Sequence, residues 1–270
     1  MGAATTIGVF DSGFGGLTVL RELLPLVPGA HYIYLGDTAR LPYGSKSRTT
    51  IARYAVESAR FLESHGADHL VIACNTATAL ALGEIMESVR IPVTGVIEPV
   101  VRMTHHRHQG ADTLILATTA TVESHAYRLF CEQRGLRPTE KACPLLVPLI
   151  EEGWIDHPVT RDVLRIYLRE ALAMCSPEVV ILGCTHYPLI ARLVTQTLNE
   201  LGSRAEVVDS ARATALAVSL GFKNSPVSSV RTGDITFECY ATDSVEKFAR
   251  LGGQFLGQSI PHVELLDLGG

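Results

Sequence analysis

Short apolar runs alternate with longer helical patterns along almost the whole of this 270-residue sequence. The runs are rich in Val and Ile, which is typical of parallel strands that are buried on both faces. Alternation of this kind predicts βαβ units, in which helices cover both faces of a parallel sheet. We expect strands at 6–10, 32–35, 70–73, 93–97, 113–117, 145–147, 179–182 and 206–208.

Helical patterns fill the intervals between the expected strands. They occupy about 17–27, 49–65, 77–89, 100–109, 122–134, 159–174, 189–201 and 211–220. Eight or more strands fit two doubly wound halves better than one sheet, although a (β/α)₈ barrel has the same count. Weak internal similarity favours two halves, because the polar turns after residues 10 and 73 are echoed by those after residues 117 and 183.

We therefore predict an α/β protein of two doubly wound parallel-sheet lobes, with the active site in the cleft between them. The first lobe is discontinuous and comprises 1–97 and 210–270, because the C-terminal segment 232–268 is expected to complete it. The second lobe comprises 98–209.

Composition limits the classes of partner. The formal net charge is −5 and the isoelectric point is near 6.1, which gives no electrostatic basis for direct binding of nucleic acid. No stretch approaches the roughly 20 apolar residues of a membrane helix. The N-terminus has no signal-peptide pattern, so we expect a cytoplasmic protein with reduced cysteines.

Two cysteines stand in matching positions. Cys74 and Cys184 each end an apolar run, and each is followed by polar residues typical of a helix start. This pattern predicts the same local geometry for both, at the carboxyl ends of strands, where open α/β sheets bind ligands. A helix N-terminus favours the thiolate form. His186 follows two residues after Cys184 and is a candidate to assist that thiol or to protonate a neighbouring group.

A glycine-rich turn after the first strand suggests a dinucleotide site at first sight, and Asp37 lies where a ribose-binding acid would lie. The fingerprint fails, because its third glycine would fall at Thr18. Asp11, directly before the glycines, would also repel a pyrophosphate. A role for Asp11 in handling a proton or an ammonium group, or as a helix N-cap, fits better.

Paired thiols allow several chemistries. A disulfide is poorly supported in a reducing compartment. A zinc site would need His186 and Asp11 beside the two thiols, and no local ligand spacing supports it, so we expect no metal. A cysteine phosphatase would need Arg at position 190, which is Ile190. A cysteine hydrolase could use Cys184 and His186, but Cys74 would then have no role.

Inversion of a stereocentre uses both thiols. One base removes a proton from one face of a carbon while an acid delivers a proton to the other face, and the roles then exchange. Pyridoxal phosphate is the usual electron sink for racemisation of amino acids. None of the four lysines ends an apolar strand as a Schiff-base lysine would, so we expect no cofactor.

Further polar turns fit the same cleft. Thr118, Thr119 and Thr121 follow a strand and suit a carboxylate, and another turn carries the Tyr43 hydroxyl and the Gly44 amide. A third polar turn ends in the two acidic residues at 151–152. The side chain of either residue faces the cleft or only solvent. The histidines at 105, 106 and 108 close a helix and are expected on the solvated surface.

Taken together, these motifs resemble those of the glutamate racemase family over nearly the whole chain. They are Phe10-Asp11-Ser12-Gly13-x-Gly15-Gly16, Gly36-Asp37-Thr38-Ala39-Arg40-x-Pro42-Tyr43-Gly44, Ala73-Cys74-Asn75-Thr76-Ala77, Gly95-Val96-Ile97-x-Pro99, Val147-Pro148-Leu149-x-Glu151 and Leu182-Gly183-Cys184-Thr185-His186-Tyr187-Pro188. The resemblance implies cofactor-independent interconversion of L- and D-glutamate, which supplies D-glutamate for peptidoglycan.

The resemblance also implies a role for each site residue. Cys74 takes the α-proton from D-glutamate with help from Asp11, and Cys184 takes it from L-glutamate with help from Glu151 and His186. Implied substrate contacts are Asp11, Ser12, Tyr43, Gly44, Asn75, Thr76, Thr118, Thr119, Thr121, Thr185 and His186. A homodimer is expected.

Three alternatives stay open from the sequence. Aspartate racemase is the nearest alternative, and the pocket for the side-chain carboxylate, whose depth a sequence does not give, decides between the two. A cysteine hydrolase of small amides would not need Cys74. A regulatory role, such as the inhibition of DNA gyrase linked to some relatives, would need contact with protein rather than with DNA.

Overall fold

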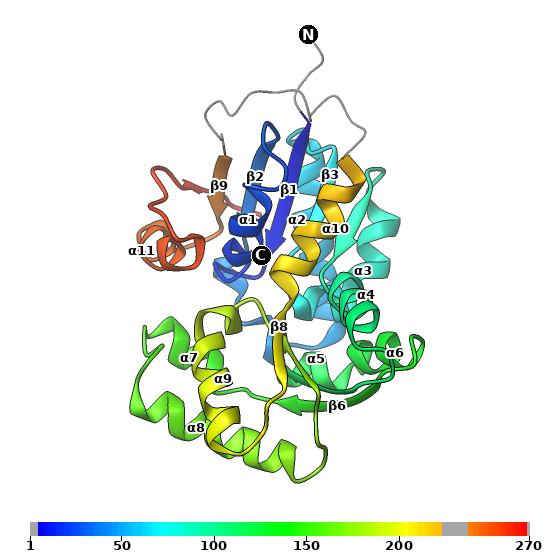
Figure 1. The fold of residues 1–270 in the computed structure, drawn as a ribbon. Helices are drawn as coiled ribbons and strands as arrows, with labels where there is room; N and C mark the ends of the chain where they lie inside the picture. The colour runs from blue at the N-terminus through cyan, green and yellow to red at the C-terminus, as the bar shows by residue number, and fades with distance from the viewer. Residues whose placement is uncertain (1–4, 223–236, 269–270) are drawn as a thin grey trace.

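The computed structural model describes residues 5–222 and 237–268, which form two parallel β-sheets with helices on both faces of each (Figure 1). The strand order of the first sheet is β10-β9-β2-β1-β3-β4, and that of the second is β6-β5-β7-β8. The strands are β1 (Thr6–Asp11), β2 (His31–Gly36), β3 (His69–Ile72), β4 (Val93–Gly95), β5 (Asp112–Ala117), β6 (Arg137–Ala142), β7 (Val179–Gly183), β8 (Glu206–Asp209), β9 (Phe237–Ala241) and β10 (Glu264–Leu265).

Helices follow most of the strands. The α-helices are α1 (Leu17–Leu23), α2 (Arg48–Ser64), α3 (Asn75–Ser88), α4 (Ile97–Arg107), α5 (Thr119–Glu123), α6 (Ala126–Glu132), α7 (Leu146–Glu151), α8 (Pro158–Leu172), α9 (Ala191–Glu200), α10 (Ser210–Phe222) and α11 (Val245–Leu256). Three short 3₁₀ helices are η1 (Thr38–Arg40), η2 (Tyr43–Ser45) and η3 (Tyr187–Ile190).

Side-chain alternation along the central strands explains the double winding. In β1, Ile7 and Val9 join the core under α1, α10 and α11, whereas Phe10 joins the core under α2 and α3. The second sheet is divided in the same way, with α4 and α6 on one face and α7, α8 and α9 on the other. Both faces of the central strands are therefore buried, as the continuous apolar runs predict.

The predicted fold class is confirmed, and the (β/α)₈ barrel is wrong because two separate sheets form. The C-terminal chain returns to the first sheet, where β9 pairs with β2 and β10 with β9. Residues 232–236 of the predicted returning segment lie outside the described residues. The lobe boundaries at 97/98 and 209/210 stay a proposal.

Four local predictions are wrong or incomplete. The strand expected at 145–147 is instead the start of α7, and the edge strand β6 precedes it. β6 has the sequence RPTEKA and no apolar run, because it is only partly buried at the edge of its sheet. Ile97, expected to end a strand, begins α4. The helix expected at 122–134 is broken at His125, which has a positive φ of 55°.

The described residues include no helix that is both long enough and apolar enough to cross a lipid bilayer.

The C-terminal helix α11 is expected to contribute strongly to stability. Phe248 is fully buried against Phe14 and Tyr34. We predict that Phe248→Ala lowers the free energy of unfolding by about 3–5 kcal/mol, measured by urea denaturation. The control Leu265→Ala removes a side chain that is 64% exposed, and we expect a change within about 0.5 kcal/mol. Equal effects of the two substitutions would contradict the placement of α11 in the core.

Candidate active site

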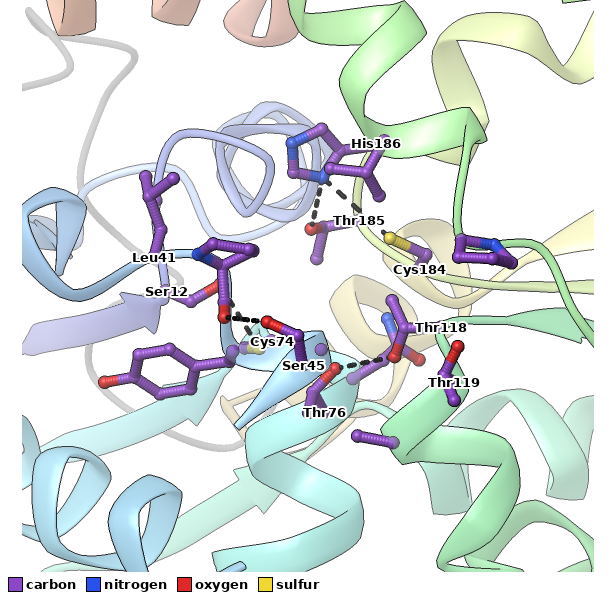
Figure 2. Close-up of a pocket in the computed structure, with 18 of the residues that line it drawn as sticks. Ser12, Leu41, Ser45, Cys74, Thr76, Thr118, Thr119, Cys184, Thr185 and His186 are labelled. Carbon is purple, nitrogen blue, oxygen red and sulfur yellow. Dashed lines mark hydrogen bonds between the residues drawn. The ribbon is translucent and has the colours of Figure 1, made fainter. Parts of the chain in front are cut away.

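A cavity of about 490 Å³ collects the carboxyl-end turns of strands from both sheets (Figure 2). Both Cys74, which follows β3, and Cys184, which follows β7, line it. The other lining residues are Ser12, Gly13, Leu41, Pro42, Tyr43, Gly44, Ser45, Lys46, Asn75, Thr76, Thr118, Thr119, Ala120, Glu123, Pro144, Val147, Pro148, Glu151, Glu152, Thr185 and His186. One cavity thus has a thiol from each sheet.

Cys74 is the N-cap of α3. Its Sγ accepts a hydrogen bond from the Ala77 N–H at 3.4 Å and donates one to Ser12 Oγ at 3.6 Å. Burial, and then the negative charge of Asp11, raise the pKa of the Cys74 thiol to about 12, although the Ala77 N–H opposes the shift. The expected stabilisation of a Cys74 thiolate by the helix start is therefore outweighed, and the thiol form is favoured.

Asp11 lies behind the cavity wall. Its carboxylate is fully buried and accepts hydrogen bonds from the Gly13 N–H at 3.0 Å and from Thr185 Oγ1 at 3.5 Å. Burial raises the pKa of Asp11, and the charge of His186 works against that shift. Asp11 does not line the cavity, so its predicted contact with substrate stays a prediction.

Cys184 has a different setting. It is followed by the 3₁₀ helix η3, so the predicted helix start is present, but the prediction of the same local geometry for both cysteines is wrong. Pro188 in η3 fits this irregular start, and α9 begins only at Ala191. The Cys184 Sγ lies 3.9 Å from His186 Nδ1.

His186 links the second thiol to a carboxylate. Its Nε2 lies 3.1 Å from Glu151 Oε1. Burial lowers the pKa of the imidazole, but hydrogen bonds to Cys184 and Glu151, with their negative charges, outweigh burial and raise that pKa to about 10. The imidazole thus lies between the Cys184 sulfur and the Glu151 carboxylate. Both Glu151 and Glu152 line the cavity, and Glu151 makes the bond to the histidine.

The two sheets are joined at the glycine-rich turn after β1. A Cβ on Gly15 would lie 2.4 Å from Thr185 Oγ1 and 2.6 Å from His186 Nδ1, so only glycine allows this approach. Thr18 Oγ1 donates to the Thr185 carbonyl oxygen at 3.1 Å across the same contact. Phe255 of α11 also packs edge-on against the His186 ring, with centroids 5.1 Å apart.

Three threonine hydroxyls meet across the cleft. Thr76 Oγ1 lies 3.0 Å from Thr118 Oγ1 and 3.2 Å from Thr121 Oγ1. Thr118 is also the N-cap of α5. Thr118 and Thr119 line the cavity, whereas Thr121 is fully buried behind them. The Thr76–Thr118 contact is drawn in Figure 2.

Tyr43 lines the cavity, but its hydroxyl is already engaged. It donates to Asp37, which also accepts from Arg40 Nε and from Thr242 Oγ1. Asp37 is fully buried in these contacts, so it is not available to a ribose, and the dinucleotide interpretation fails on geometry as well as on sequence. Gly44 lies against Thr118, where an added Cβ would be 3.0 Å away.

Sequence reasoning missed several lining residues. Leu41, Pro42 and Val147 are apolar loop or helix residues without a chemical signature, and Lys46 directly follows η2. Their positions within or next to the recognisable motifs were the only available signal. None of the histidines at 105, 106 and 108 lines the cavity, and His108 instead pairs with Glu206.

The zinc alternative has no geometric support. Within residues 5–222 and 237–268, no three His, Cys, Asp or Glu side chains are grouped so that they could hold a metal ion. The cysteine hydrolase alternative left Cys74 without a role, yet Cys74 lines the same cavity as Cys184.

Comparison with known proteins gives a consistent result. The family model described as Asp/Glu/Hydantoin racemase matches residues 7–218. A glutamate racemase of Koribacter versatilis is 48% identical, with 98% of each chain covered. Glutamate racemase from Francisella tularensis, solved in complex with D-glutamate, is 34% identical and superimposes with a TM-score of 0.88, covering 98% of both chains. Glutamate racemase RacE1 from Bacillus anthracis is 31% identical with a TM-score of 0.90 and the same coverage.

The His186 imidazole is expected to stay protonated through neutral pH. We predict that its C–H signals in NMR titrate near pH 10, and that Glu151→Gln lowers this pKa by removing a negative partner. Because the folded-state pKa is raised, the resulting stabilisation is complete below the ordinary histidine pKa of about 6.5 and is lost as pH rises through 10.

Glu152→Gln is the matched control, since Glu152 lines the cavity without the bond to His186. It should leave the titration of His186 almost unchanged. A wild-type midpoint near 6.5, or equal shifts in the two variants, would contradict this electrostatic account.

Proposed function

Because the chain belongs to the aspartate/glutamate racemase family, as a member of its glutamate racemase branch, we propose that it interconverts L- and D-glutamate by proton transfer between two thiols. The observation that carries the proposal is that Cys74 and Cys184, from different sheets, line one cavity. No cofactor is needed for this chemistry. The D-glutamate formed would supply peptidoglycan synthesis.

In the direction from L-glutamate, Cys184 is the base. Its thiolate takes the α-proton, so the Cα–H bond breaks, an S–H bond forms and the electron pair stays on the substrate. His186 assists from beside this thiol, with its Nδ1 3.9 Å from the Cys184 Sγ. Cys74 then gives its proton to the other face of the carbon, which breaks its S–H bond and forms the new Cα–H bond.

The reverse direction exchanges the roles of the thiols. Cys74 takes the α-proton from D-glutamate, and Cys184 delivers one. In the direction from L-glutamate, where Cys74 is the acid, its raised pKa suits a group that holds its proton until the carbanion forms. Asp11 lies behind the wall and would act on Cys74 through its charge, and its contact with substrate stays a prediction.

Substrate contacts are proposed for the polar lining of the cavity. These residues are Ser12, Tyr43, Gly44, Asn75, Thr76, Thr118, Thr119, Thr185 and His186. Tyr43 would contribute its ring or backbone, since its hydroxyl is bound to Asp37. Thr121 would support Thr76 and Thr118 from behind.

Glutamate is favoured over aspartate because the similar chains at 31–48% identity are glutamate racemases. A homodimer and the cytoplasmic location expected from the sequence belong to the same proposal. No observation favours the regulatory role.

The two thiols should be separately essential. We predict that Cys74→Ser and Cys184→Ser each lower kcat for racemisation of glutamate by at least about 100-fold, because a serine hydroxyl is a much weaker acid than a thiol. Circular dichroism and thermal unfolding should show an intact fold. Optical rotation from both L- and D-glutamate measures the activity.

Cys175→Ser is the control, since this partly exposed thiol does not line the cavity. It should keep near wild-type activity. Full activity in either Cys74→Ser or Cys184→Ser would refute the two-thiol mechanism, and activity with aspartate but not glutamate would refute the proposed substrate.

A further inference from the structure

Three buried polar side chains, Tyr127, Asn75 and Ser210, are joined by hydrogen bonds at the wall of the cavity. Tyr127 on α6 donates its hydroxyl proton to Asn75 Oδ1 at 2.6 Å. Asn75 Nδ2 donates to Ser210 Oγ at 3.4 Å, and Ser210 also acts to lower the pKa of Tyr127, so it lies close to both residues. These residues come from the first turns of α3, α6 and α10, three segments that are far apart in the sequence.

The distances give a direction to the bonds. A separation of 2.6 Å is typical of O–H···O and short for N–H···O, which has its usual range near 2.9–3.0 Å. The Asn75 atom facing Tyr127 is therefore the carbonyl oxygen. Burial raises the pKa of the Tyr127 phenol well above its usual value, so the hydroxyl keeps the proton that it donates.

With its oxygen bonded to Tyr127, the Asn75 side chain has its amide nitrogen available to the cavity. The Asn75 amide nitrogen has two hydrogens, and one of them points to Ser210. The other has no protein partner among the described residues, and Asn75 lines the cavity. Tyr127 occupies one acceptor position of the oxygen and fixes the orientation of the amide, so the second N–H is the group that Asn75 offers to the cavity.

We propose that Tyr127 is a positioning residue that, with Ser210, holds the Asn75 amide so that it donates an N–H to a carboxylate of the substrate. This inference rests on the proposed function. It adds which partner is the hydrogen-bond donor in one contact between protein and substrate. An amide donor can bind either carboxylate of glutamate but not its ammonium group. Tyr127 touches neither substrate nor thiol and acts through Asn75.

The position of the Tyr127 ring supports this role. Tyr127 is fully buried, and a Cβ on Gly183 would lie 3.0 Å from its Cε2 atom. The glycine before Cys184 thus leaves space for the ring, which crosses from the second sheet to Asn75 beside Cys74. Tyr127 therefore contacts Gly183, directly before Cys184, and Asn75, directly after Cys74.

Tyr127→Phe tests the proposal, because it removes the hydroxyl and keeps the ring. We expect KM for both L- and D-glutamate to rise about tenfold, the equivalent of about 1.4 kcal/mol. We also expect kcat to change less than about threefold and the pH profile of kcat to stay in place, since no proton-transfer group is altered.

A dicarboxylate without an amine separates the carboxylate contact from other effects. Calorimetric titration with glutarate should show a rise in Kd by the same factor in Tyr127→Phe. This measurement needs no turnover, so it tests Tyr127 even if the wild-type protein fails to racemise glutamate, a result that would refute the proposed function alone.

Tyr32→Phe is the matched control. Tyr32 is also fully buried, and its hydroxyl donates to the backbone carbonyl oxygens of Leu23 and Val27, away from the cavity. It should lose stability without a change in KM or in the Kd of glutarate. Should Tyr127→Phe not fold, Ser210→Ala removes the other support of the amide and should raise both constants.

Unchanged KM and Kd in a folded Tyr127→Phe variant would overturn the proposal. So would equal changes in Tyr32→Phe, or a higher KM for glutamate with an unchanged Kd for glutarate.

Discussion

The site depends on the contact between the glycine-rich turn after β1 and the turn that carries Cys184. Thr18 and Gly15 bring the first sheet against Thr185 and His186, and a side chain at Gly15 would prevent it. Each thiol stands at the end of a strand in its own sheet, so neither sheet alone could face both sides of one carbon. The close backbone approach converts two separate strand ends into one cavity.

The two thiols are alike in position but not in environment. Cys74 caps a helix, yet burial and the neighbouring Asp11 raise its pKa to about 12. Cys184 precedes a 3₁₀ helix rather than an α-helix, and its neighbour is His186, whose pKa is raised to about 10. Proton transfer across a stereocentre requires one acid and one base at the same moment, and the proposed mechanism assigns these roles to two thiols in different surroundings.

Much of this was accessible from the sequence, because parallel strands buried on both faces have a strong apolar signal and end at polar turns. That signal located Cys74 and Cys184 correctly. It failed for β6, a partly exposed edge strand without an apolar run, and for η3, where tertiary contacts decide the local form. The apolar pattern also gave no indication of a role for Tyr127, since only folding brings this residue to Asn75.

Isotope incorporation tests the central claim most directly. L-glutamate is incubated with the protein in deuterated water without added cofactor, and both enantiomers are analysed in the first turnovers. A thiol holds a single proton, so the account predicts that the D-glutamate formed carries α-deuterium while the remaining L-glutamate is still protiated. D-glutamate that retains the original proton would mean that one base serves both faces, and would contradict the account.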